Sequence, residues 1–239
     1  MRFWIAIAAA LLLAAAFFVS GNRWVRQWRV ADRTIITKGF SQKAVTSDLA
    51  TWSAEITVRS PQITPGYTKM AADLQTVLAF LEQNKIPQNL VDRTAISVSL
   101  KFKQNDSGAT NEIELYELKQ SIGVQSNDIR LIDRISKEIT SLLQNGVEVK
   151  SQNPKFYYTH LETLKIDMLS EAARDGRNKA ERIATSGGGR LGSLFSAQQG
   201  VFQVTPALSF EVSDEGSFDT TAIEKTARAI VTAKYVLGE

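Results

Sequence analysis

The spacing of hydrophobic and polar residues along the chain predicts both strands and helices. Residues 49–58 alternate strictly, with Ala50, Trp52 and Ile56 among the apolar positions and polar residues between them, as in a half-buried strand. Residues 94–102 alternate in the same way. The other segments that we expect to be strands are 34–40, 112–124 (with a bulge near Tyr116), 155–159, 191–204, 208–212 and 226–236. Strands with one buried face therefore make up much of the chain.

Three other segments repeat apolar residues every three to four positions, which predicts amphipathic helices. They are residues 67–84, 129–142 and 161–185. Ser126 and Asn127 are suited to cap the second helix. The longest helix carries a stripe of residues of decreasing size, namely Leu164, Met168, Ala172, Gly176, Ala180 and Ala184. Because small side chains permit a close approach, we expect this stripe to lie against a sheet.

The order of these elements predicts an α+β fold. Helices interleave with antiparallel strands, and the strict βαβα alternation of a doubly wound sheet is missing. We therefore expect two-layer α/β sandwiches with largely antiparallel sheets. Residues 34–89 and 160–239 are expected to combine into one α+β subdomain, and residues 90–159 to form an inserted β-β-α-β subdomain.

An uninterrupted apolar run at residues 3–19 predicts a membrane helix ahead of this body. At about 1.5 Å per residue, the run is at the short limit for crossing a bilayer, and it is longer than the roughly 7–15 apolar residues of a typical signal peptide. Trp24 and Trp28 follow it as interfacial anchors would. Two interpretations stay open: an uncleaved single-pass anchor, which we prefer, and a signal that is removed near Val19-Ser20-Gly21. In both cases residues 1–33 address the chain to a membrane.

The positive charge is concentrated in the same segment. Residues 1–33 hold five arginines and one acid, and the remainder has 23 basic and 24 acidic residues. A nucleic-acid-binding protein would carry its basic excess on the folded body, so nucleic acid is not expected as a partner. The positive-inside rule, applied to these arginines alone, would place the body in the cytoplasm. The signal-like start and the resemblance described below favour export instead.

The composition is that of an ordinary globular protein and offers little catalytic chemistry. The absence of cysteine excludes disulfides and thiol nucleophiles, and the single histidine, His160, is better suited to capping or packing. The glycine-rich residues 187–192 follow a helix, whereas a phosphate-binding loop precedes one. Asp214, Glu215 and Asp219 could hold a hard cation, but a solvated loop is the better interpretation. We predict no catalytic, cofactor or metal site.

Two blocks of the chain resemble the SIMPL-domain family, which includes the bacterial periplasmic immunogenic proteins. The first is Ile35–Gly39 followed by Val45 and by Ser47–Ala50, where serine replaces the family's proline. The second is the alanine-rich Ala172–Ala184 followed by Gly189–Gly192. The order and separation of these blocks make the resemblance more specific than either block alone.

The resemblance implies a two-part α+β body that is exported to the periplasm or held at the inner membrane facing it. Some relatives assemble into ring-like or channel-like homo-oligomers, others are linked to oxidative-stress tolerance, and no catalytic residues carry over. We expect a non-enzymatic envelope protein, anchored by residues 3–19, whose body self-assembles or binds an unknown protein partner. The alternative is a soluble periplasmic binding module for a small ligand or cell-wall fragment after signal cleavage. An enzyme of novel chemistry is a third interpretation.

Overall fold

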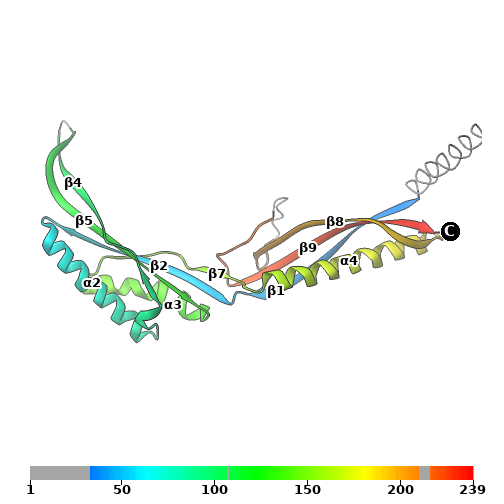
Figure 1. Ribbon diagram of the computed structural model, residues 1–239, viewed down its shortest axis with the longest axis horizontal. Coiled ribbons are helices and arrows are strands. Elements are labelled where there is room, and N and C mark those ends of the chain that lie inside the picture. The colour runs from blue at the N-terminus through cyan, green and yellow to red at the C-terminus, as the bar shows by residue number, and fades with distance from the viewer. Residues whose placement is uncertain (1–32, 107, 210–215, 239) are drawn as a thin grey trace, which may run out of the picture.

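The structure is a computed structural model that describes residues 33–106, 108–209 and 216–238. It shows an elongated molecule in which two α+β units lie end to end (Figure 1). The chain starts in one unit, enters the other near Ser47 and returns near Tyr158. Each unit has its own sheet and its own covering helices.

The first unit is a three-stranded antiparallel sheet with one long helix along one face (Figure 1). Its strands are β1 (Thr34–Thr46), β8 (Arg190–Pro206) and β9 (Glu224–Gly238), in the order β1-β9-β8, and its helix is α4 (Leu161–Ser186). The predicted stripe on α4 is confirmed, because its six residues are the buried ones of the helix. We call this part the α4 unit.

Two glycines let α4 approach the sheet closely. A Cβ atom on Gly39 of β1 would lie 1.8 Å from the carbonyl oxygen of Ala172 and 2.5 Å from the backbone nitrogen of Gly176. Beside them, the Thr37 hydroxyl donates to the carbonyl oxygen of Gly176 at 2.8 Å. The strand expected at 34–40 is longer than predicted, since β1 continues to Thr46 through its pairing with β9.

The second unit is a six-stranded antiparallel sheet with two helices on one face (Figure 1). Its strands are β2 (Leu49–Ser60), β3 (Val91–Arg93), β4 (Ser97–Asn105), β5 (Gly108–Ser126), β6 (Val149–Ser151) and β7 (Lys155–Tyr157). Its helices are α2 (Ile63–Gln83) and α3 (Ile129–Glu138), with the short 3-10 helices η1 (Gln88–Leu90) and η2 (Ile139–Asn145). Ile56, Leu78, Leu118 and Ile132 belong to the buried cluster between sheet and helices. We call this part the α2–α3 unit.

The α+β class with antiparallel sheets is confirmed, but the division of the chain differs from the expected one. The strand order is β3-β5-β2-β6, with β4 paired to β5 and β7 paired to β2. Residues 49–89, which we grouped with 160–239, therefore lie in the same unit as residues 90–157. The physical reason is the pairing of β2 with β5, which runs from Ala50–Ser126 to Ser60–Tyr116 and cannot be read from local patterns.

The structure also tests three local expectations. Helix α3 is capped by Asp128, whose Oδ1 accepts a hydrogen bond from the Leu131 backbone at 3.0 Å, and not by Ser126 or Asn127. The bulge expected near Tyr116 is confirmed, because the β4–β5 register passes over Glu114, two positions earlier. The expected strand at 208–212 begins in a turn, and residues 210–215 lie outside the described ranges.

The predicted membrane helix at residues 3–19 also lies outside the described residues. Within the described ranges, no helix combines the length and the apolar character needed to cross a membrane.

Candidate functional site

The strands β4 and β5 extend beyond the rest of their sheet as a two-stranded arm, which we define as residues 97–106 and 108–116 (Figure 1). Every residue of β4 is exposed. Val98, Leu100, Phe102 and Ile113, which we call the apolar stripe, have between 38% and 44% of their surface exposed. The described residues thus leave a row of large apolar side chains open on this arm.

The apolar stripe continues the buried face of the sheet past the end of its helical cover. Val98 is paired with Leu118, which is fully buried and lies against Gly66 in the first turns of α2. Leu100 and Phe102 follow on the same face of β4, because side chains two residues apart in a strand point the same way. Helix α2 begins at Ile63, so no further turn of it covers these residues.

The opposite face of the arm carries paired charges. Lys103 Nζ lies 2.9 Å from Glu112 Oε2, and this contact lowers the pKa of the Glu112 carboxyl. Glu117 contacts Lys101 at 3.4 Å and Arg59 at 3.0 Å. Burial raises the pKa of Glu117, but these two cations lower it by more. One face of the arm is therefore suited to water, and the other to another apolar surface.

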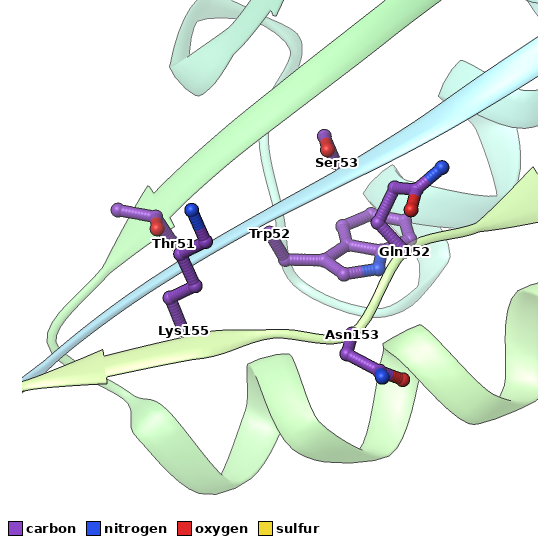
Figure 2. Close-up of a pocket in the computed structure, with 6 residues that line it drawn as sticks. All are labelled: Thr51, Trp52, Ser53, Gln152, Asn153 and Lys155. Atoms are coloured by element: carbon purple, nitrogen blue, oxygen red, sulfur yellow. The ribbon is translucent and has the colours of Figure 1, made fainter. Parts of the chain in front are cut away.

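A second candidate is an open depression along the edge of β2, between β6 and β7 (Figure 2). It has a volume of about 510 Å³ and is lined by Thr51, Trp52, Ser53, Gln152, Asn153 and Lys155. The indole of Trp52 forms its inner wall and donates to Ser151 Oγ at 3.0 Å. Neither a carboxylate nor a histidine is among the lining residues. The depression can therefore form hydrogen bonds and contact an anion, but it brings no acid–base pair together.

His160 lies where the chain returns to the α4 unit. Its side chain forms no capping hydrogen bond with α4, is 75% exposed, and has Nε2 3.8 Å from Asp48 Oδ2. The same carboxylate accepts hydrogen bonds from the Thr159 backbone and hydroxyl, at 2.8 and 3.0 Å. In a catalytic triad the histidine lies between the acid and the nucleophile. Here Thr159 and His160 both contact the Asp48 carboxylate directly, so the histidine does not hold that position. This cluster joins the two chain crossings rather than forming a catalytic relay.

The sequence suggested that Asp219 lies in a solvated loop, but in the structure its side chain is largely buried. It accepts hydrogen bonds from Lys225 Nζ at 2.8 Å, from the Thr221 hydroxyl at 2.7 Å and from the Ala222 backbone at 2.9 Å. Burial raises the pKa of this carboxyl, but the donors together lower it to about 2. Lys225 is only 1% exposed and also donates to the Ala222 carbonyl. This buried ion pair holds the loop at 216–223 between the two units.

The remaining sequence candidates carry no site within the described residues. Asp214 and Glu215 lie outside those residues, and no described group of three His, Cys, Asp or Glu side chains could hold a metal ion. Gly187 to Gly189 end α4 as predicted, with Gly188 in the left-handed region at φ 77°. Sequence analysis missed the depression beside Trp52, because its two walls are far apart along the chain.

Solved structures offer distant similarities only. An amidase of the hydantoinase/carbamoylase family from Burkholderia phymatum is 10% identical over 54% of this chain and 36% of the amidase, with a TM-score of 0.30. An uncharacterized conserved protein from Listeria innocua is 8% identical over 80% of this chain and 92% of its own, with a TM-score of 0.21. The designed protein Foldit4 is 22% identical over 43% and 93%, with a TM-score of 0.20. No argument about function rests on similarities of this size.

The comparison with protein families is more informative. No curated protein matches the chain. The profile of one family, described as "SIMPL: Protein of unknown function (DUF541)", matches residues 35–235. That range includes both sheets, α4 and the two sequence blocks at its ends. The chain therefore belongs to the SIMPL family, a family without a known enzymatic activity.

Proposed function

We propose that this SIMPL protein is a non-enzymatic protein of the bacterial envelope, held at the inner membrane by residues 3–19, whose periplasmic body self-associates through the β4–β5 arm. The observation that carries this proposal is the uncovered apolar stripe. A two-stranded ribbon is at best marginally stable alone in water, and an exposed apolar patch on such an element is typical of a contact surface. Covering the stripe would supply the packing that the arm lacks.

A second copy of the chain is the occupant that the geometry favours. The arm lies at the opposite end of the molecule from Thr34, where the chain comes from the membrane-directed segment (Figure 1). On a tethered protein it would reach outward toward neighbouring copies. Two apolar stripes can face each other across a two-fold axis, which is the commonest symmetry of homo-oligomers. The family resemblance implies that some relatives form homo-oligomers, which supports this choice.

Light scattering on the body from residue 34 onward, over a concentration series, tests the proposal. This body contains all three buried clusters among the described residues, so its cores are complete. We expect a defined species larger than a monomer, and we expect Leu100→Lys with Phe102→Lys to reduce it to a monomer. Ser99→Lys, on the opposite face of β4, is the matched control and should leave the mass unchanged. A body that is monomeric at every concentration would rule out self-association.

The depression beside Trp52 supports a second candidate function, the binding of a small ligand or cell-wall fragment. Trp52 is the only tryptophan from residue 34 onward, so the fluorescence of the body reports this site directly. Titration with soluble peptidoglycan fragments should shift the Trp52 emission, and Lys155→Met should weaken the response. Lys165→Met, on α4, is the control. An emission unchanged at saturating fragment would argue against this function.

A further inference from the structure

The face of the three-stranded sheet that points away from α4 is open and carries large apolar side chains among polar and basic ones. Thr37, Gly39 and Ser41 of β1 are buried on the α4 side, so the residues between them point to the other side. We define the outer sheet face by Ile36, Lys38, Phe40, Phe195, Ile230 and Lys234. Strand pairing places Ile36 opposite Lys234 and Phe40 opposite Ile230. Ile36, Phe40 and Phe195 are 62%, 43% and 52% exposed.

The strands of the α4 unit are more basic than its helix. Helix α4 carries five carboxylates and five cations, so it is neutral overall. The three strands carry six cations but a single acid, Glu224, at the end next to the other unit. Lys38 and Lys234 form no salt bridge with a described carboxylate, and Lys234 Nζ lies 5.1 Å from the centre of the Phe195 ring. The outer sheet face is therefore both basic and aromatic.

The α2–α3 unit provides an internal comparison. The corresponding outer face of its sheet is also charged, but Lys119 lies 3.0 Å from Glu55, and Arg59 contacts both Glu117 and Glu148. Lys119 and Arg59 are thus neutralised within the chain, whereas Lys150 and Lys155 of the same sheet form no salt bridge with a described carboxylate. Open cations therefore occur on both sheets, and Lys38 and Lys234 are those on the unit that follows the apolar run.

From this placement we propose that the outer sheet face lies on the anionic lipid surface of the membrane to which the chain is tethered. The inference rests on the membrane attachment in the proposed function. Fourteen residues separate the apolar run from Thr34, a reach of at most about 50 Å, so the α4 unit stays within reach of the bilayer surface. Lysines attract anionic headgroups, and aromatic side chains beside them enter the interfacial layer. A basic face with exposed apolar side chains beside a membrane anchor favours lipid over an acidic protein.

The chain contains no cysteine, so single cysteines allow a site-specific test on the full-length protein. Gln198→Cys places a fluorophore on the outer sheet face. Gln198 is exposed, and it is paired with Thr232, which is itself paired with Lys38 of that face. Asn178→Cys places the same fluorophore on the exposed side of α4. Each protein is reconstituted into vesicles of phosphatidylcholine and phosphatidylglycerol in equal parts, with a headgroup-proximal nitroxide lipid as quencher.

We expect quenching of the Gln198 probe and little quenching of the Asn178 probe. Lys38→Glu with Lys234→Glu, or vesicles of phosphatidylcholine alone, should reduce the Gln198 signal to the Asn178 level. Arg177→Glu with Arg182→Glu on α4 makes the same change in net charge and should leave it unchanged. Circular dichroism checks that each variant is folded.

The failures are distinguishable. A chain that does not float with the vesicles overturns both the membrane attachment and this inference. A chain that floats while both probes respond alike overturns the inference alone. A third outcome also overturns the inference: the lipid quencher has no effect on the Gln198 probe, but soluble polyglutamate protects the probe from quenching by iodide. That result would indicate an acidic protein partner.

Discussion

Lys225 is a fully buried cation at the start of β9, next to the loop at 216–223. Its ammonium group has the Asp219 carboxylate and the Ala222 carbonyl as partners. Three donors from the loop also reach that carboxylate, namely the backbone and hydroxyl of Thr221 and the backbone of Ala222. Removing one member of a buried ion pair commonly costs about 3–5 kcal/mol, because the other charge stays buried without a partner. Protonation of the Asp219 carboxylate would therefore weaken the contact that holds the loop at 216–223 to Lys225.

Acid should weaken the fold through Asp219. The pKa of this carboxyl is lowered from 3.8 to about 2, so the folded protein binds the proton less tightly than the unfolded chain does. Its contribution, roughly 2 kcal/mol, is complete above about pH 4 and is lost as the pH falls toward 2. Urea unfolding across this range should show the loss in the wild-type body.

Asp219→Asn should be less stable at neutral pH and should lack this part of the acid dependence. Asp92→Asn, at an exposed position, serves as the control and should retain the wild-type slope. If Asp219→Asn follows the wild-type slope, the acid sensitivity arises elsewhere.

At the scale of elements, the contact between β1 and α4 depends on the missing side chain of Gly39. Gly39→Ala would bring a Cβ atom against the Ala172 carbonyl, where backbone atoms cannot yield without moving the helix. We expect a loss of about 3 kcal/mol in the free energy of unfolding. Thermal or urea unfolding measures it.

Gly123→Ala is the matched control in the other sheet, since the nearest atom to its new Cβ would be 3.9 Å away. It should change stability little. Equal losses in the two variants would mean that the cost does not come from the close approach of Gly39 to α4.

The elements also show how far local patterns extend. The alternation at 94–102 correctly predicted that Ile96, Val98, Leu100 and Phe102 share one face. It could not indicate that α2 covers the sheet only as far as Leu118, because the extent of a helix over a strand depends on the β2–β5 register. A stripe expected to be core is therefore exposed on the arm.

At the scale of the whole molecule, hydrogen exchange can locate the proposed interface. In a dilute body the amides of β4 should exchange faster than those of β2, which is paired on both sides. Raising the concentration into the range where the body associates should slow β4 selectively. The exposed positions of α4 provide the comparison. Association without slower exchange in β4 would place the interface away from the arm.

Sequence alone was sufficient for properties that depend on local order along the chain. Periodicity identified the α+β class, the buried stripe of α4 and the glycine end of that helix, and two short blocks pointed to the SIMPL family. These features are set by side-chain spacing and backbone preference within a few residues.

Only the tertiary structure decided which segments share a unit and which faces stay open. The assignment of β2 and α2, the partner of Asp219, the depression beside Trp52 and the outer sheet face all require residues far apart in the sequence to meet. These contacts depend on strand pairing and on where helices stop covering sheets. Neither can be predicted from the pattern of residues along the chain. The surfaces that we propose for function belong to this second group, because they are defined by what the rest of the fold leaves uncovered.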